Sequence, residues 1–122
     1  MNVRHVVVVR KDLQMSPGLL AAQVAHISDQ FLRQRALESA KFSALEKEWC
    51  KEPYITVLAV NTKEELQEVA KRASDARLSV KEWNDTLVMP TLALPLRVFV
   101  GISIGPDDSD KLKAVTNDLP LL

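Results

Sequence analysis

Apolar positions along the chain form patterns of two kinds, which predict strands and helices. Short apolar runs rich in β-branched residues predict four strands, over residues 6–9, 54–60, 78–83 and 97–104. The first run is four consecutive valines, so we expect side chains to cover both faces of that strand. The pair Gly105-Pro106 is expected to end the last strand.

Apolar positions spaced three and four residues apart, together with capping residues, predict four helices. They are expected from Pro17 into the thirties, over residues 36–49, after Thr62 and over residues 107–116. The elements therefore follow the order strand, helix, helix, strand, helix, strand, strand, helix. This order predicts an α/β fold with a single domain over residues 1–122, built as a four-stranded mixed β-sheet with helices on both faces.

The composition is ordinary for a soluble globular domain, since 47% of the 122 residues are apolar and 26% are charged. The single cysteine, Cys50, cannot form an internal disulfide, which favours a reducing, intracellular setting. The first residues lack the apolar core of a signal peptide, and no uncharged stretch is long enough to span a membrane. We therefore expect a cytoplasmic protein that has no membrane partner.

Sixteen basic and sixteen acidic residues give a formal net charge of zero. This balance argues against a broadly basic surface for nucleic acid and leaves a local basic patch open. With three glycines, the chain has no glycine-rich nucleotide-binding motif. One cysteine and two histidines, His5 and His26, supply no recognisable spacing of zinc ligands. We expect no metal site and no cofactor.

The turn between the first strand and the first helix is a place where α/β proteins commonly bind ligands. It brings Arg10 and Lys11 together with the free amides of a helix start, and these groups attract anions. Gln23 and His26 follow on one flank of that helix, and Asp85 follows the third strand. We expect these three to border one concave site with the cations. The alternatives are a solvated helix flank and a turn aspartate bonded to nearby backbone.

Two motifs near the N-terminus resemble those of a known family. Residues 6–13 read VVVVRKDL and residues 21–26 read AAQVAH, in the order and spacing of type 2 peptidyl-tRNA hydrolases, the archaeal and eukaryotic kind. The Ile-Gly-Pro at residues 104–106 and the closing Leu-Pro-Leu-Leu also resemble that family. The resemblance is clear over residues 6–28 and 97–122, and the middle of the chain matches mainly in the order of its elements.

The resemblance implies hydrolysis of the ester that joins a peptide to the terminal ribose of tRNA, without a metal or an organic cofactor. It carries over three catalytic positions, which are Gln23, His26 and Asp85. Thr86 or Thr91 is the candidate to replace the catalytic threonine of the family, and neither is in register. In this interpretation Asp85 orients or deprotonates water, His26 assists proton transfer or positions the substrate, and Gln23 holds the acyl or ribose group. Thr86 stands near the place of a threonine in the family motif.

Phosphate contacts and partners also follow from the resemblance. Arg10, Lys11 and Arg97 are the expected contacts to the phosphates of tRNA. Peptidyl-tRNA is the expected partner, and a homodimer is left open.

The chain departs from the family at two places beside the implied site. The family has a lysine four residues before the glutamine, and this chain has Leu19 there. The family follows its aspartate with Ala-Gly, a basic residue or histidine, and Thr-Gln, whereas residues 86–90 here read Thr-Leu-Val-Met-Pro. Losing a cation that serves a phosphate or an oxyanion predicts weakened hydrolysis.

The residues leave two other functions open. One is a family member without catalysis that binds RNA or a protein partner through the same face, with the apolar stretch over residues 86–96 as an interface. The other is an enzyme that uses the same scaffold for a small molecule.

Overall fold

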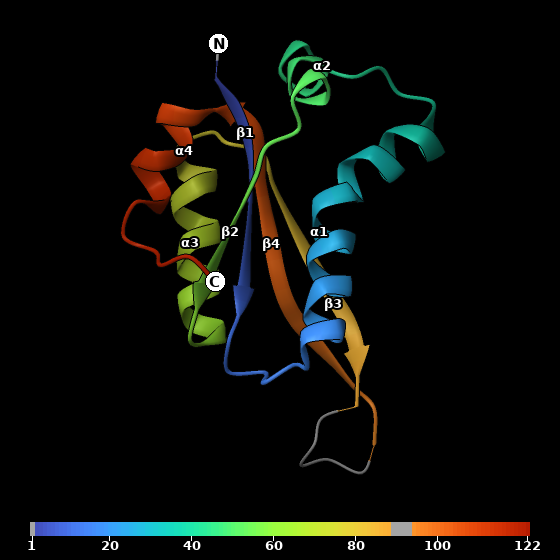
Figure 1. Cartoon of the computed structure of the whole chain (residues 1–122), viewed down its shortest axis with the longest axis vertical. Helices are drawn as coiled ribbons and strands as arrows, with labels where there is room; N and C mark the ends of the chain where they lie inside the picture. The colour runs from blue at the N-terminus through green and yellow to red at the C-terminus, as the bar shows by residue number, and fades with distance from the viewer. Residues whose placement is uncertain (1, 89–93) are drawn as a thin grey trace.

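Four strands hydrogen-bond into one sheet in the computed structural model, which describes residues 2–88 and 94–122 (Figure 1). The strands are β1 (Val3–Arg10), β2 (Ile55–Val60), β3 (Val80–Leu87) and β4 (Leu96–Asp108). Their order across the sheet is β2-β1-β4-β3. Because β1 runs parallel to β2 and antiparallel to β4, and β4 runs antiparallel to β3, the predicted mixed sheet is confirmed.

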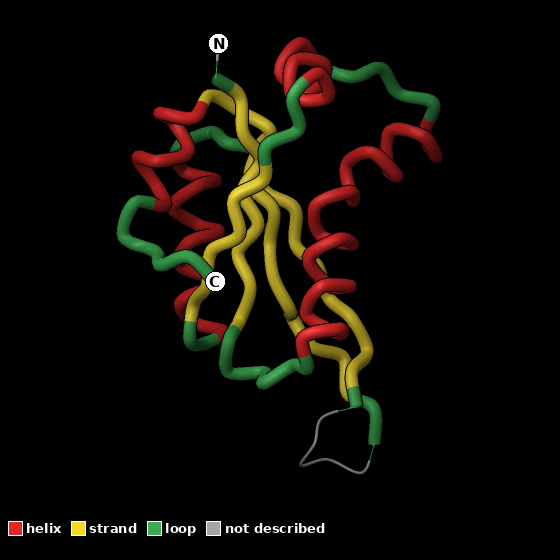
Figure 2. Tube along the Cα trace, in the orientation of Figure 1, coloured by secondary structure: helices red, strands yellow, loops and turns green. Residues whose placement is uncertain are grey.

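Helices cover both faces of this sheet, as predicted. The helices are α1 (Pro17–Glu38), α2 (Ala44–Lys51), α3 (Lys63–Asp75) and α4 (Ser109–Thr116). Figure 1 shows α1 and α2 on one side of the sheet and α3 and α4 on the other. The C-terminal tail returns along the edge strand β2, where Leu121 forms a bridge with Leu58 (Figure 2). Among the described residues, no helix has the length and apolar character needed to cross a membrane.

The valines of β1 form the centre of the core. The even-numbered valines, Val6 and Val8, pack in a cluster with side chains of α3 and α4, whereas Val7 and Val9 pack on Ile27 of α1. All four are at most 3% exposed. The expectation that both faces of this strand are covered is therefore confirmed, and alternation along the strand decides which helix each side chain meets.

A glycine on β4 allows α1 to lie close to the sheet. Gly101 pairs with Val9 of β1. A Cβ at this position would lie 2.6 Å from the carbonyl oxygen of Val8 and 2.8 Å from Cδ1 of Ile27. Both distances are shorter than a packed carbon tolerates, so only glycine leaves room for Ile27 here. This contact sets how near α1 approaches the neighbouring strands.

The helix predicted over residues 36–49 begins too early. The first helix runs on to Glu38 and ends where Ser39 adopts a left-handed conformation with φ of 51°. The next helix begins only after Ser43, whose side chain accepts a hydrogen bond from the Glu46 amide while the Glu46 carboxylate accepts one from the Ser43 amide. This capping box fixes the start of α2, and the apolar spacing alone does not reveal it.

Both strands of the C-terminal hairpin are longer than predicted. β3 extends through Asp85 and Thr86 to Leu87, because these residues pair with β4. The expected apolar connection over residues 86–96 is correspondingly shorter, and residues 89–93 of it lie outside the described residues. Asp85 is therefore a strand residue and not a turn aspartate.

The pair Gly105-Pro106 does not end β4, contrary to the prediction. Gly105 has a positive φ of 95° and the peptide bond that follows it is cis. Pairing with β1 resumes beyond it, with Asp107 opposite Arg4. The helix that follows starts at Ser109, where the Asp108 side chain accepts hydrogen bonds from the first amides.

A histidine is buried without polar partners beneath α1 and α2. His5 is fully buried, and its ring lies edge-on to Phe31 at 5.3 Å and to Trp49 at 5.4 Å between centroids. Neither ring nitrogen has a hydrogen-bond partner among the described residues. Burial disfavours the charged form and lowers the pKa of His5 from 6.5 to about 4.

This histidine makes the stability of the fold depend on pH. Between pH 6.5 and about 4 the unfolded chain binds a proton at residue 5 that the folded chain does not bind. The free energy of unfolding therefore falls as the pH is lowered. Between about pH 7 and about pH 4.5 we expect His5 to lower the free energy of unfolding by about 2 kcal/mol. The variant His5→Leu should not show this decrease.

Denaturant unfolding at the two pH values measures this difference. His26→Gln is the matched control, because His26 is the other histidine of the chain and its side chain is exposed. An equal loss in wild type and His5→Leu would contradict the assignment.

Candidate active site

Gln23 is brought to the sheet by the first turns of α1. The helix starts cleanly because Pro17 occupies its first position and the Ser16 hydroxyl accepts a hydrogen bond from the Leu19 amide, at 3.3 Å. Gln23 lies one turn before Ile27, on the stripe of the helix that faces the sheet. Its side chain is consequently buried, with 2% of its surface exposed.

The opposite wall of the site is the outer half of β3. Successive side chains of a strand point to opposite faces, so Trp83, Asp85 and Leu87 share the face on which α1 lies. Asp85 pairs with Val98 of β4, whose side chain packs in the same cluster as Leu87. The pairing of β3 with β4 thus aims the Asp85 carboxyl group at α1.

Two hydrogen bonds join these two walls, and a third holds the carboxylate within β3. The Trp83 indole Nε1 donates to Gln23 Oε1 at 2.6 Å, and Gln23 Nε2 donates to Asp85 Oδ2 at 2.9 Å. The second oxygen, Asp85 Oδ1, accepts from the Thr86 backbone amide at 2.8 Å. The carboxylate is therefore held at both of its oxygens, and Gln23 is bonded at both ends of its amide.

These contacts favour the ionised form of Asp85. The hydrogen bond from Gln23 is the largest cause that lowers the pKa of Asp85 below its ordinary value. The Thr86 amide and the nearby positive charges of His26 and Arg97 act in the same direction, while partial burial opposes them. The site thus presents a carboxylate, and not a carboxylic acid, at neutral pH.

His26 lies at the exposed mouth of this site. Its ring stacks on Trp83, with 5.4 Å between centroids and 27° between planes. The guanidinium of Arg33 also lies over the Trp83 ring, at 5.4 Å, and Arg33 Nη2 donates to the His26 carbonyl at 2.8 Å. The side chain of His26 stays accessible to solvent, so it is the group best placed to meet a substrate beside Asp85.

The structure brings the predicted catalytic residues together unequally. Gln23 and Asp85 are hydrogen-bonded, and His26 is close enough for its charge to act on Asp85. Thr86 meets the cluster through its backbone amide, because strand alternation turns its side chain to the other face of β3. The side chain of Gln23 is buried and both ends of its amide are hydrogen-bonded within the protein. Its expected contact with the acyl or ribose group of a substrate stays a prediction.

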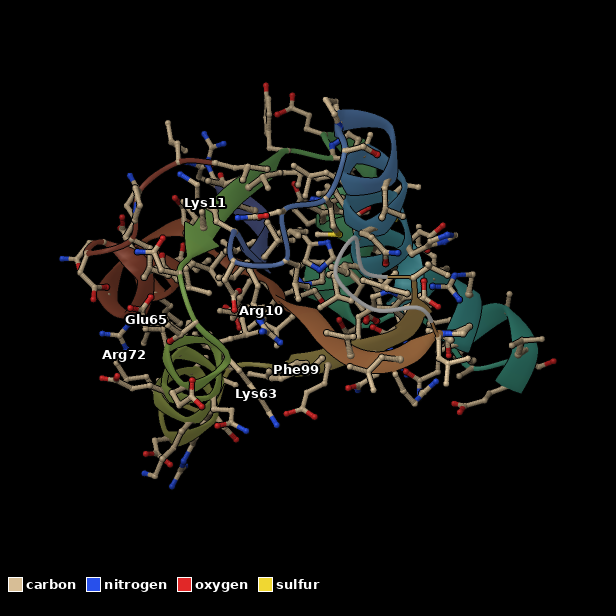
Figure 3. All side chains as sticks on the ribbon, turned by 90° about the horizontal axis from the view of Figure 1, so that it is seen from below. Arg10, Lys11, Lys63, Glu65, Arg72 and Phe99 are labelled. Atoms are coloured by element: carbon tan, nitrogen blue, oxygen red, sulfur yellow. The ribbon has the colours of Figure 1, made fainter. Side chains whose placement is uncertain are left out.

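The expectation that Arg10 lines the same concave site as Gln23 is wrong. Alternation along β1 puts Arg10 on the face of the even-numbered valines, which is the face covered by α3. There its guanidinium donates to both carboxylate oxygens of Asp12, at 3.0 and 2.7 Å, and to the Phe99 carbonyl at 3.0 Å. Figure 3 shows Arg10 beside Phe99 on this side of the sheet. Lys11 follows in the turn and is exposed.

A mostly apolar hollow of about 300 Å³ lies between the β1–α1 turn, the start of α1 and the end of β3. Its walls include Leu19, which lies one turn before Gln23, and Leu87, which lies two residues after Asp85 on the same face of β3. Leu13 and Met15 from the β1–α1 turn, and Val88 after β3, add further apolar side chains to its lining. Leu19 is 36% exposed and brings a hydrocarbon, and no charge, to this wall.

Sequence reasoning missed the roles of Trp83 and Arg33. Trp83 lies two residues before Asp85, and the alternation of a strand would have put both on one face if β3 had been extended to Leu87. Arg33 follows His26 by two helical turns, which is a spacing that puts both on one stripe. Neither signal shows from sequence alone that His26 and Arg33 both lie against the ring of Trp83.

A metal ion has no evident site in the part of the chain that the structure describes. Within residues 2–88 and 94–122, no three side chains of His, Cys, Asp or Glu gather closely enough to hold one.

Comparisons with known proteins match nearly the whole chain. A model of the family described as "Peptidyl-tRNA hydrolase PTH2" matches residues 3–122. The chain is 40% identical to the peptidyl-tRNA hydrolase of Methanopyrus kandleri, over 98% of this chain and 97% of that protein. It is 31% identical to the enzyme of that name from Methanothermobacter thermautotrophicus, over 98% and 100%. It is 33% identical to the peptidyl-tRNA hydrolase of Staphylothermus marinus, over 98% of this chain and 94% of that protein.

The buried amide of Gln23 can be tested by putting a charge in its place. Gln23→Glu keeps an oxygen for the Trp83 indole but sets a second carboxylate against Asp85. Two carboxylates this close cannot both stay ionised, so the folded variant has one raised pKa. We expect a loss of roughly 2 to 3 kcal/mol in the free energy of unfolding near pH 8, which shrinks as the pH falls to about 5.

Unfolding of the variant and of wild type at the two pH values gives this difference. Gln23→Leu is the matched control, because it removes the same hydrogen bonds without adding a titratable group. Both pH values lie above the ordinary pKa of Asp85, 3.8, so its loss should change much less between them than that of Gln23→Glu. A loss that is independent of pH in Gln23→Glu would contradict the contact with Asp85.

Proposed function

Because the chain belongs to the peptidyl-tRNA hydrolase PTH2 family, we propose that it hydrolyses the ester between a peptide and the terminal ribose of tRNA. The observation that carries the proposal is the Gln23–Asp85 hydrogen bond, which holds an ionised carboxylate beside the exposed His26. Ester hydrolysis needs an oriented water, a group that accepts its proton and a group that returns a proton to the leaving oxygen.

In the proposed mechanism Asp85 orients the attacking water. Its oxygens accept from Gln23 and Thr86, and each retains a lone pair that can accept a hydrogen bond from water. The water oxygen forms a bond to the ester carbonyl carbon as its proton passes toward Asp85. The bond from that carbon to the ribose oxygen then breaks, and His26 assists in returning the proton to this oxygen. The products are a peptide with a free carboxyl group and a tRNA with a free ribose hydroxyl.

The tRNA phosphates are proposed to contact Lys11 and Arg97. Both side chains are exposed, and Arg97 is close enough to act on the charge of Asp85. Arg10 is a poorer candidate, because Asp12 already neutralises its charge. We propose the cytoplasm as the compartment, because peptidyl-tRNA is made there. Association into a homodimer stays a prediction, which sedimentation velocity of the purified chain tests.

Hydrolysis of a defined peptidyl-tRNA tests the proposed function directly. We expect the purified chain to release the peptide, and Asp85→Asn to lower the rate by about a hundredfold or more. Asparagine keeps an oxygen for the hydrogen bond from Gln23, so the fold should persist. Glu82→Gln is the matched control, because this exposed carboxylate lies on the same strand but points to the other face. Binding of tRNA without hydrolysis would contradict the proposal and favour a family member without catalysis.

A cation at residue 19 should raise the activity. Leu19 stands where the family lysine is expected, and Leu19→Lys would bring a positive charge to the wall of the hollow, one helical turn before Gln23. A positioned cation or donor that stabilises a developing oxyanion is worth a factor of about a hundred when fully in place, so we expect at least a severalfold increase in kcat/KM. The thermal midpoint should change little, because Leu19 is 36% exposed.

Leu37→Lys is the control for this variant. It adds the same charge to the same helix at a position that is 87% exposed and lies near the helix end. An equal increase in both variants would show general attraction of tRNA and not an effect at the site.

A further inference from the structure

We propose that Trp83 is a positioning residue, which acts through Gln23 to orient the carboxylate of Asp85. The inference rests on the proposed function for its kinetic consequence, but its structural part concerns only the contacts among these three side chains. The indole N–H can only donate a hydrogen bond, and it points at one end of the Gln23 amide at 2.6 Å. That end must therefore be the carbonyl oxygen, Oε1.

The orientation of the Gln23 amide decides what Asp85 meets. With Oε1 turned to the indole, the NH₂ group faces Asp85 Oδ2 and donates to it at 2.9 Å. If the amide were turned by 180°, its carbonyl oxygen would face the carboxylate and its NH₂ group would face the indole N–H. Two acceptors would then face each other at Asp85 and two donors at the indole. Leaving buried polar groups unpaired in this way is costly. Trp83 thus selects the one orientation in which Gln23 supports an ionised Asp85.

The ring of Trp83 is itself held in place on several sides. Its partner across the ladder is Gly101, which has no side chain to displace the ring. The ring packs against the cluster of Val7, Val9 and Ile27, and His26 and Arg33 of α1 lie against it. A side chain fixed by packing in this way can fix a second one by a hydrogen bond, since neither has freedom to turn away.

Other charged groups face Asp85 and remain when Trp83 is changed. They are His26 from α1 and Arg97 from β4, and both favour the carboxylate, as does the Thr86 amide. Trp83 is therefore expected to shift the titration of Asp85 without abolishing its ionisation at neutral pH.

Trp83→Phe is the decisive variant, because it keeps an aromatic ring against His26 and Arg33 but removes the N–H donor. We expect the carboxyl carbon of Asp85, followed by NMR during a pH titration, to titrate at higher pH than in wild type. In the hydrolysis assay we expect kcat to fall about tenfold, the equivalent of one lost hydrogen bond, with little change in KM. The acid limb of the pH–rate profile should move to higher pH with it.

Trp49→Phe is the matched control within the same chain. Trp49 is the other tryptophan, is 5% exposed, and donates its indole N–H to the Tyr54 carbonyl at 2.9 Å. Its replacement removes one equivalent hydrogen bond away from Asp85. It should lower the free energy of unfolding but leave both the titration of Asp85 and the pH–rate profile unchanged.

Wild type alone provides a measurement that does not depend on how well the variant folds. The indole N–H signal of Trp83 should shift with the same midpoint as the carboxyl carbon of Asp85, because Gln23 connects them. An indole signal of Trp83 that is indifferent to this titration, or an Asp85 that titrates identically in Trp83→Phe, would overturn the inference. An absence of hydrolysis with these NMR results intact would instead overturn the proposed function.

Discussion

A primary amide buried in protein needs a hydrogen-bond acceptor at one end and a donor at the other, and this requirement ties the two walls of the site together. Gln23 is buried on α1, and the partners that satisfy it, Trp83 and Asp85, both come from β3. The helix can therefore not slide or rotate on the sheet without leaving polar groups unpaired. The close approach at Gly101 sets the distance between the layers, and the amide sets their register.

The order of elements was predictable because the signals that decide it are local. The valine run of β1, the Ser16-Pro17 start of α1 and the apolar spacing of α3 each lie within a few residues. The ends of β3 and β4 were not predictable, because the end of each strand depends on its pairing with the other. Thr86 belongs to a strand only because Arg97 lies opposite it, and no pattern within either segment records that pairing. The start of α2 was missed for a different reason, since a capping box was read as part of a longer helix.

The same distinction separates what was and was not predicted of the site. Sequence motifs pointed to Gln23, His26 and Asp85 as site residues. That Asp85 lies close to the other two depends on the pairing of β3 with β4. The side of the sheet on which Arg10 lies depends on where β1 ends. Alternation from the valines assigns it to the α3 face once the strand is known to include it. The role of a buried polar group is harder to predict, because it requires knowing that Gln23 has no access to solvent.

In the proposed mechanism, support and chemistry are carried by different residues of this site, and this affects how divergence acts on it. Trp83 and Gln23 are held inside and are proposed to set the state of Asp85, whereas Asp85 and His26 are the groups proposed to meet the substrate. Leu19 belongs to neither network and lies on the wall of the hollow. A change at that wall can remove a charge that stabilises the transition state while the carboxylate stays oriented and ionised. In the proposed mechanism, substitutions there are expected to alter the rate without disturbing the fold, because no buried polar group loses its partner.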